Sequence, residues 1–312
     1  MVLQHFTTLS DISSSQLNQL LQLAHSITEC PDNFSDLCHG KILGTLFFEP
    51  STRTRLSFES AMQRLGGTCL GLQSGATSST TKGETLADTI QTVSCYTDVI
   101  AMRHFHEGAA TLAAEVATVP LINAGDGGHL HPTQTLTDLL TILETKSRLD
   151  HLTVGFCGDL KFGRTVHSLI QALIEYDANH FVLISPTELK IPDYIKNILD
   201  QHHITYTESE TLEEVIDQLD VLYMTRVQKE RFFNEADYER LKDTNILDLK
   251  TLERAKSDLA ILHPLPRLNE IHPEVDQDPR AAYFKQVQYG VYVRMALLLT
   301  LLEVDHATDN ID

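Results

Sequence analysis

The sequence predicts an α/β protein of two domains, each a mostly parallel sheet covered by helices. Its 312 residues exceed the usual size of a single hydrophobic core, and 42% of them are hydrophobic, which is enough for two cores. Short apolar runs of strand length alternate with segments of helical periodicity along most of the chain. This β-α-β-α order is typical of parallel sheets that helices cover on both faces.

In the first half, apolar residues recur at helical spacing or form short continuous runs. Helices are expected at residues 13–24, 55–65 and 107–116. Strands are expected at residues 41–48, 99–102 and 120–122. The segment 73–82 (QSGATSSTTK) has no apolar anchor, so we expect a loop there, either a functional lid or a tolerated connection.

The second half repeats the alternation after an amphipathic helix at 133–145, and we place the domain boundary around that helix. The expected domains are therefore 1–134 and 150–286. Strands are expected at 153–157, 181–184, 221–224 and 260–262, with a helix at 165–175. A C-terminal helix, about 288–305, is expected to pack back across the first domain.

Composition limits the classes of partner. There are 43 acidic and 24 basic residues, a formal charge of −19 that repels nucleic acid and anionic lipid. The first ten residues lack a secretory signal pattern, and the apolar stretch 295–302 is too short to span a bilayer. Five cysteines without a C-x-x-C pair give little support for disulfides or structural zinc. We therefore expect a soluble cytoplasmic protein with reduced thiols.

Since ligands of open α/β sheets bind beyond the carboxyl ends of the strands, the segments after each apolar run are informative. The run Ser51-Thr52-Arg53-Thr54-Arg55 follows a predicted strand and begins a helix. Hydroxyls, guanidinium groups and the free N–H groups of a helix start suit a phosphate dianion. An ordinary N-cap with solvated arginines is the alternative, and the density of the run disfavours it.

A second segment, His131-Pro132-Thr133-Gln134, follows a glycine-rich loop and again begins a helix. His129 and His131 form an H-x-H pair, as do His104 and His106, but no further metal-ligand motif accompanies them, so we expect no metal.

Three further segments follow predicted strands in the second half. Residues 158–165 have the spacing of a P-loop, but Arg164 occupies the position of the P-loop lysine. We therefore expect Arg164 to bind a carboxylate at a helix start rather than a nucleotide phosphate. Residues 224–231 (MTRVQKER) and 263–267 (HPLPR) are the other two, with a solvated helix start and a rigid turn as the simpler alternatives.

The segments FEPSTRTR, MRH, HPTQ, DLKFGRT, MTRVQKER and HPLPR, in this order, resemble the catalytic chains of the aspartate carbamoyltransferase family, with likeness over residues 41–302. STRTR and HPTQ alone would also suit ornithine carbamoyltransferases. HPLPR differs from the cysteine-containing H-C-L-P of those enzymes, and no acidic S-M-G-like patch for a cationic amine is present. Arg226 and Gln228 instead indicate a dicarboxylate acceptor.

The resemblance implies transfer of the carbamoyl group of carbamoyl phosphate to L-aspartate, an early step of de novo pyrimidine biosynthesis, without cofactor or metal. The domain 1–134 would bind carbamoyl phosphate and the domain 150–286 aspartate, with the active site in the cleft between them. The family pattern assigns carbamoyl phosphate to Ser51, Thr52, Arg53, Thr54, Arg103, His131, Gln134, Leu265 and Pro266. Of these, Thr54, Arg103 and His131 are the implied donors to the carbamoyl oxygen.

For aspartate the resemblance assigns Lys82, Arg164, Arg226 and Gln228, with Ser78 and Thr165 in support. In the family, Ser78 and Lys82 would come from the neighbouring subunit of a homotrimer. This chain has Thr81-Lys82 where the family has two adjacent lysines, and we map the functional one onto Lys82. Another acceptor such as ornithine, a non-catalytic anion-binding role, and bound regulatory chains remain open alternatives.

Overall fold

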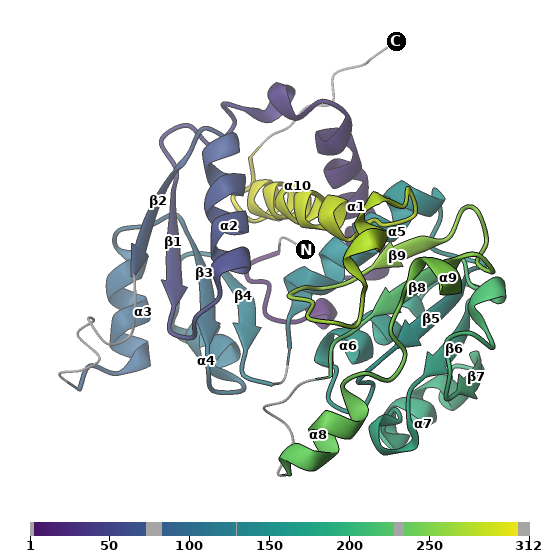
Figure 1. The fold of residues 1–312 in the computed structure, drawn as a ribbon. Helices are drawn as coiled ribbons and strands as arrows, with labels where there is room; N and C mark the ends of the chain where they lie inside the picture. The colour runs from purple at the N-terminus through teal and green to yellow at the C-terminus, as the bar shows by residue number, and fades with distance from the viewer. Residues whose placement is uncertain (1–2, 73–82, 129, 228–233, 305–312) are drawn as a thin grey trace. The chain divides into compact units, whose positions relative to one another are not determined.

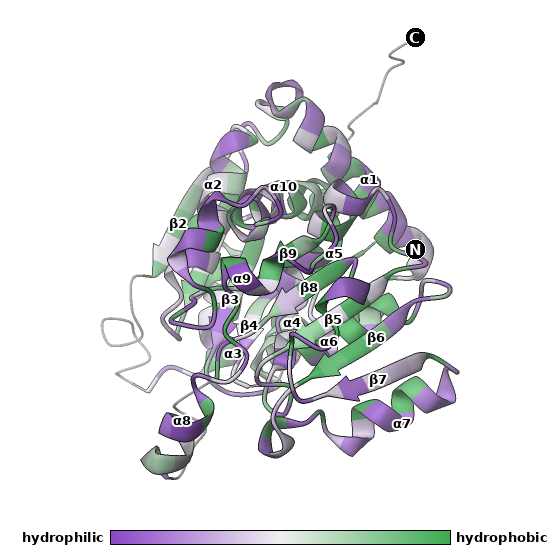
Figure 2. Cartoon of the chain, turned by 45° about the vertical axis from the view of Figure 1, so that its right-hand side comes forward, coloured by the Kyte–Doolittle hydropathy of each residue, from purple (hydrophilic) through white to green (hydrophobic). Residues whose placement is uncertain are grey.

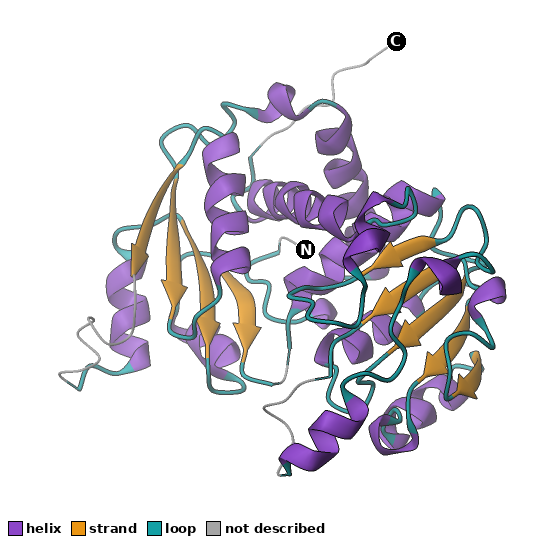
Figure 3. Ribbon diagram, in the orientation of Figure 1, coloured by secondary structure: helices purple, strands orange, loops and turns teal. Residues whose placement is uncertain are grey.

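The computed structural model describes residues 3–72, 83–128, 130–227 and 234–304, and its fold is drawn in Figures 1 and 3. The chain divides into two compact units. The first unit comprises Met1–Leu140 and Val287–Asp312, and the second comprises Thr141–Gln286.

The first unit is built on a four-stranded sheet in the order β2-β1-β3-β4, and its strands pair in parallel. The strands are β1 (Ile42–Phe47), β2 (Thr68–Leu72), β3 (Val99–His104) and β4 (Leu121–Asp126). In register, Leu43 pairs with Val99, and Ile100 with Leu121. Every residue of β3 and β4 is buried, as expected of a parallel sheet covered on both faces.

The helices of the first unit are α1 (Ser14–Glu29), α2 (Thr52–Arg64), α3 (Leu86–Ser94), α4 (Ala109–Val116), the start of α5 (Pro132–Lys146) and most of α10 (Tyr283–Leu301), and α2, α3 and α4 pack against the sheet. The start of α1 shows how the sequence sets a helix boundary. Ser13 Oγ accepts from the Gln16 amide at 3.3 Å, and Gln16 Oε1 accepts from the Ser13 amide at 2.9 Å. This capping box satisfies two backbone donors that the helix itself leaves free.

The second unit contains a five-stranded parallel sheet in the order β7-β6-β5-β8-β9. Its strands are β5 (Thr153–Cys157), β6 (His180–Ile184), β7 (Thr205–Ser209), β8 (Val221–Met224) and β9 (Ala260–Leu262). Its helices are α6 (Arg164–Leu173), α7 (Asp193–Gln201), α8 (Glu235–Leu241) and α9 (Leu249–Leu252). Figure 2 shows hydrophobic residues concentrated in β5 and β6, whereas β7 at the sheet edge is mostly hydrophilic.

Short 3₁₀ helices occur at Leu9–Asp11, Pro31–Phe34, Thr187–Leu189, Ile216–Gln218 and Pro273–Gln277.

The predicted fold class is confirmed, with two helix-covered parallel sheets. Several boundaries differ from the sequence-based expectations. Helix α2 begins at Thr52 rather than residue 55, and the C-terminal helix runs Tyr283–Leu301 rather than 288–305. Within the described residues, no helix combines the length and apolarity needed to cross a membrane.

Candidate active site

Several of the predicted site residues lie beside the topological switch point of each sheet, whereas His131 follows β4 and Leu265 follows β9. In the first unit the chain leaves β1 toward β2 and then returns to place β3 on the other side of β1. In the second unit the same reversal separates β5 from β8. Ligands of open α/β sheets bind at the carboxyl ends of the strands flanking such a point. The segments that follow β1, β5 and β8 carry Arg53, Arg164 and Arg226 respectively, and Arg103 lies near the end of β3.

The loop from β1 leads directly into the first turn of α2. Ser51 is the N-cap residue, and its side chain makes no capping hydrogen bond. Thr52 and Arg53 are exposed in the first turn, while Thr54 is buried. A helix start presents unpaired N–H groups and the positive end of the helix dipole, so this turn can bind an anion such as phosphate.

Arg103 lies near the end of β3, where it is only 8% exposed. Its Nη2 lies 2.9 Å from Glu49 Oε2, an ion pair, and its Nη1 donates to the Ala124 carbonyl at 3.4 Å. Its Nε is buried, without a hydrogen-bond acceptor among the described residues. Gly125, at φ +124°, permits this placement, because a Cβ there would lie 2.6 Å from Arg103 Nη1. Glu49 was not among the predicted site residues, although it adjoins the STRTR run.

Thr54 and His131 meet although they are 77 residues apart in sequence. Thr54 Oγ1 lies 3.4 Å from His131 Nε2, and both side chains are buried. A Cβ at Gly125 would also lie 3.7 Å from His131 Cδ2, so Arg103 and His131 both border this glycine. The structure therefore brings His131 close both to Thr54 and to the glycine that Arg103 borders, and these three are the predicted donors to one oxygen.

Gln134 lies in the first turn of α5 and is tied to Asp138 one turn later. Its Nε2 donates to Asp138 Oδ1 at 2.7 Å. This hydrogen bond fixes the orientation of the Gln134 amide group, and with it the direction of the amide oxygen. Because a carbamoyl NH₂ group needs an acceptor, this oxygen has the chemistry that the predicted role requires.

Buried polar residues of β4, which the sequence analysis did not select, shape the glycine-rich loop. Asn123 Oδ1 accepts from the Gly125 amide at 2.8 Å. Asp126, only 2% exposed, accepts from the amides of Leu130 and Gly108 at 3.0 and 2.9 Å. Such bonds fix the loop that carries His131. The sequence signal was available in the polar Asn-Ala-Gly-Asp ending of an otherwise apolar strand.

In the second unit, the ends of β5 and β8 are tied together. The Asp159 amide donates to Thr225 Oγ1 at 3.1 Å, and the Thr225 amide donates to the Cys157 carbonyl at 2.8 Å. Gly158, at φ +119°, allows this approach, since a Cβ there would lie 2.2 Å from the Thr225 carbonyl oxygen. Arg164 begins α6, and Arg226 directly follows Thr225. Two arginines thus stand on two joined segments.

The HPLPR segment is organised by a buried histidine–carboxylate pair. His263 Nε2 lies 2.7 Å from Glu270 Oε1, and His263 Nδ1 accepts from the Leu265 amide at 2.8 Å. Burial would raise the pKa of Glu270, but the hydrogen bonds from His263 and from backbone amides outweigh burial and lower it. Leu265 adopts φ 55° before Pro266. Arg267 is engaged elsewhere, in a bidentate pair with Asp276.

Three predicted residues, Ser78, Lys82 and Gln228, lie outside the described residues. Thr165 is the second residue of α6. His104 Nδ1 accepts from the His106 amide at 3.0 Å, and burial lowers the pKa of His104. Within the described ranges, no group of three or more His, Cys, Asp or Glu side chains is arranged to hold a metal ion.

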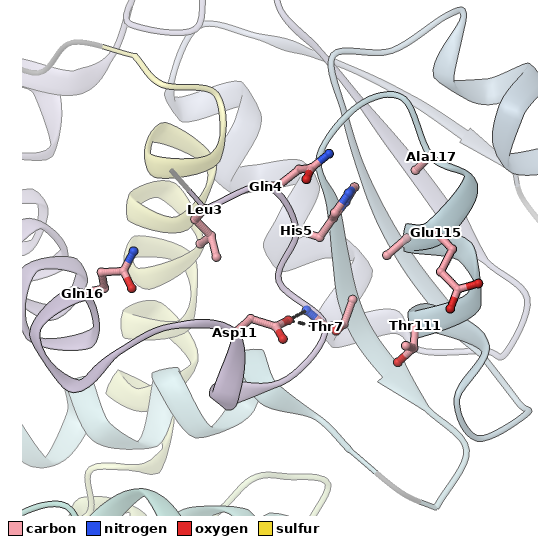
Figure 4. Close-up of a pocket in the computed structure, with 10 residues that line it drawn as sticks. Leu3, Gln4, His5, Thr7, Asp11, Gln16, Thr111, Glu115 and Ala117 are labelled. Atoms are coloured by element: carbon pink, nitrogen blue, oxygen red, sulfur yellow. Dashed lines mark hydrogen bonds between the residues drawn. The ribbon is translucent and has the colours of Figure 1, made fainter. Parts of the chain in front are cut away.

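A pocket of about 670 Å³ in the first unit lies between the N-terminal segment and α4 (Figure 4). Its lining includes His5, Thr7, Asp11, Thr111 and Glu115. None of the predicted site residues belongs to this lining. The pocket is therefore separate from the donor cluster around Gly125.

Two switch points, each with arginines at helix or strand ends, define an α/β enzyme whose substrates are anionic. Two family models match the chain. The "Aspartate/ornithine carbamoyltransferase, carbamoyl-P binding domain" matches residues 4–144, and the "Aspartate/ornithine carbamoyltransferase, Asp/Orn binding domain" matches residues 150–301. The chain belongs to the aspartate/ornithine carbamoyltransferase family.

The names of individual relatives are more specific than those of the family models. The aspartate carbamoyltransferase catalytic subunit of Finegoldia magna is 67% identical over 294 residues, 94% of this chain and 96% of that protein. That of Clostridium kluyveri is 57% identical over 301 residues, 96% and 98% of the two chains. The catalytic subunit of M. jannaschii aspartate transcarbamoylase superposes with a TM-score of 0.91 at 46% identity, covering 96% of this chain and 98% of the other. The Trypanosoma cruzi enzyme in complex with carbamoyl phosphate and aspartate gives 0.88 at 38% identity, covering 96% and 97%.

Proposed function

We propose that this chain transfers the carbamoyl group of carbamoyl phosphate to the amine of L-aspartate, giving N-carbamoyl-L-aspartate and phosphate. The observation that carries the proposal is that His131 lies against Thr54, in the anion-binding first turn of α2, and that His131 and Arg103 both border Gly125. A phosphate group at the helix start would place an attached carbamoyl oxygen among these donors. The region 1–134 is thereby assigned to carbamoyl phosphate and 150–286 to aspartate.

The mechanism follows from where charge develops. An uncharged aspartate amine attacks the carbamoyl carbon, and negative charge accumulates on the carbonyl oxygen. Thr54, Arg103 and His131 stabilise that charge, and each fixed donor contributes on the order of 3 kcal/mol. Arg103 suits this role because its guanidinium is already immobilised by Glu49 and the Ala124 carbonyl, so little reorganisation is needed.

Phosphate then leaves against the start of α2, where Ser51, Thr52 and Arg53 compensate its charge. The carbonyls of Leu265 and Pro266 and the side chain of Gln134 are assigned to the carbamoyl NH₂ group. None of the assigned side chains is an obvious base, so we assign the amine proton to the departing phosphate. Holding two anions together that repel each other in solution supplies a further part of the rate.

Aspartate is favoured over ornithine as acceptor because the switch point of the second unit carries Arg164 and Arg226 on segments joined through Thr225. Guanidinium groups pair with carboxylates and repel a cationic amine. The high identity to aspartate carbamoyltransferase catalytic subunits supports the same choice. Gln228 and Lys82 complete the assigned aspartate site, with Ser78 and Thr165 in support.

By the same family likeness, we assign the chain to a cytoplasmic homotrimer that acts early in pyrimidine biosynthesis. Each site would take Lys82 and Ser78 from the neighbouring subunit. Sedimentation of the purified protein, alone and after extraction from its source cell, distinguishes a trimer from a larger assembly that includes regulatory chains.

An acceptor screen tests the proposed function. The purified protein is supplied with carbamoyl phosphate and, separately, with L-aspartate, L-ornithine or other amino acids, and both phosphate and the carbamoylated product are measured. We expect kcat/KM for aspartate to exceed that for every other acceptor by at least about a hundredfold, as a site built for two carboxylates would give. Product from ornithine at a comparable rate would contradict the assignment, and phosphate release without a carbamoylated product would reject transferase activity.

A further inference from the structure

A buried arginine outside the predicted site connects the two helices that carry the carbamoyl-phosphate residues. Arg294, in α10, is 4% exposed. Its Nη1 donates to Ser57 Oγ at 3.0 Å and its Nη2 to Thr133 Oγ1 at 3.2 Å. Nη1 also lies 3.5 Å from Thr137 Oγ1 and 2.8 Å from the Gly290 carbonyl. One guanidinium therefore joins α2, α5 and α10.

Burial of this arginine is energetically unfavourable. Among the described residues no carboxylate forms an ion pair with it, and its Nε is buried without an acceptor. Burial lowers the pKa of the Arg294 guanidinium to about 10, and the negative charge of Asp138 only partly opposes that effect. The Phe58 ring, whose centroid lies 5.1 Å from Arg294 Cζ, gives a cation–π contact. An apolar side chain would fill this space without the desolvation penalty, so packing alone does not account for the residue.

The partners of Arg294 lie close in sequence to the proposed catalytic groups. Ser57 is three residues after Thr54, so the two side chains share one face of α2. Thr133 is two residues after His131, in the first turn of α5. Thr54 and His131 themselves are 3.4 Å apart. A shift of either helix would open this contact, and Arg294 is bonded to both helices, at the second turn of α2 and the first turn of α5.

We propose that Arg294 is a positioning residue for carbamoyl transfer: its guanidinium fixes the second turn of α2 and the first turn of α5 relative to each other, and so fixes the distance between Thr54 and His131. This inference rests on the proposed function. It predicts that loss of Arg294 affects the handling of carbamoyl phosphate much more than that of aspartate, because neither Arg164 nor Arg226 lies on these helices.

The test compares Arg294→Met, Arg294→Lys and a matched control, Leu299→Ala. Leu299 is fully buried in the same helix, five residues on and about 140° around it, so its truncation costs stability in α10 without touching these hydrogen bonds. We expect Arg294→Met to raise the KM for carbamoyl phosphate and to lower kcat, each by about tenfold or more, while the KM for aspartate changes by less than about threefold. Arg294→Lys keeps the charge but cannot bridge both hydroxyls, so it should recover only part of the loss.

A second readout is independent of catalysis. Amide hydrogen exchange is followed in residues 52–58 and 132–137, and exchange in Arg294→Met should be about tenfold faster than in the wild type and in Leu299→Ala. Calorimetric titration with phosphonoacetamide, a non-reactive analogue of carbamoyl phosphate, should show a parallel loss of affinity. If Arg294→Met does not fold, the double variant Ser57→Ala, Thr133→Val removes the acceptors instead and should give the same pattern.

The outcomes separate the two proposals. A wild-type protein without transferase activity would reject the proposed function, while the exchange data would still test the tie between the helices. An active wild type whose Arg294→Met form keeps normal carbamoyl-phosphate kinetics and normal exchange would overturn the role of Arg294. Equal effects in Leu299→Ala and Arg294→Met would show general core damage and would also overturn it.

Discussion

Replacement of Gly125 by alanine perturbs the proposed oxyanion donors without removing any of them. The new Cβ would lie 2.6 Å from Arg103 Nη1 and 3.2 Å from its Cζ. Restoring ordinary contact requires the guanidinium to move by about 0.8 Å, away from the position fixed by Glu49 and the Ala124 carbonyl, and misplacement by about 1 Å costs roughly a hundredfold in rate. The φ of +124° at this position adds a backbone penalty of about 1–3 kcal/mol for any residue with a Cβ.

We therefore expect Gly125→Ala to lower kcat/KM for carbamoyl phosphate by roughly 30- to 100-fold, or about 2–3 kcal/mol of transition-state stabilisation. Initial rates of carbamoyl-aspartate formation at varied carbamoyl phosphate provide the assay. The matched control is Gly40→Ala, because Gly40 also has a positive φ, +78°, but a Cβ there meets nothing within 4 Å. The control should lose stability and keep its kinetics. Normal kinetics in Gly125→Ala, or an equal loss in both variants, would refute the assigned role of Arg103.

Four further outcomes are expected. Arg53→Ala should abolish turnover through lost phosphate binding, worth roughly 1.5–3 kcal/mol or more, and near-normal calorimetric affinity for carbamoyl phosphate would refute this. Arg226→Ala should raise the aspartate KM by about a hundredfold or more with carbamoyl-phosphate binding nearly intact, whereas equal damage to both substrates would contradict its placement. Arg53→Ala and Lys82→Ala, inactive alone, should recover about a quarter of the wild-type sites when unfolded together and reassembled, because a shared site draws the two residues from adjacent chains; a remixed pair as inactive as its parents would place Lys82 within its own chain. Glu270→Gln should lower the free energy of unfolding by about 1–3 kcal/mol at pH 7. Since the pKa of Glu270 is lowered in the fold, that difference should be complete above the ordinary carboxyl pKa of about 4.3 and should shrink as pH falls through the lower folded value, which urea titrations at several pH values would measure.

The sequence predicted those strands whose burial on both faces leaves a run of apolar residues. Strands β3, β4 and β5 are almost wholly buried and therefore appear as continuous apolar runs. Strands β2 and β7 were missed because three of the five residues of each are exposed, so burial leaves only a weak apolar signal in their sequences.

In the candidate site, residues marked by their sequence neighbours could be predicted, and residues whose partners are distant in sequence could not. Arg53, Arg164 and Arg226 could be predicted because a polar run directly after an apolar one marks a strand's carboxyl end. Glu49 and Arg294 could not, because their partners Arg103 and Ser57 are distant in sequence, whereas Asp126 could have been found from the polar ending of β4. Arg294 in particular stands 237 residues from Ser57, in a helix whose remaining residues are largely apolar. No local pattern distinguishes such a residue from a surface arginine.

We expect one site to hold a phosphate-bearing group and a dicarboxylate at the same time. Calorimetric titration with N-phosphonoacetyl-L-aspartate tests this most directly, compared with phosphonoacetamide and with the corresponding ornithine conjugate. Because association entropy is lost only once for a joined ligand, the aspartate conjugate should bind at least about a thousandfold more tightly than phosphonoacetamide, and the ornithine conjugate should gain little. Equal affinity for the aspartate conjugate and phosphonoacetamide would contradict a joint site, and tighter binding of the ornithine conjugate would contradict aspartate as the acceptor.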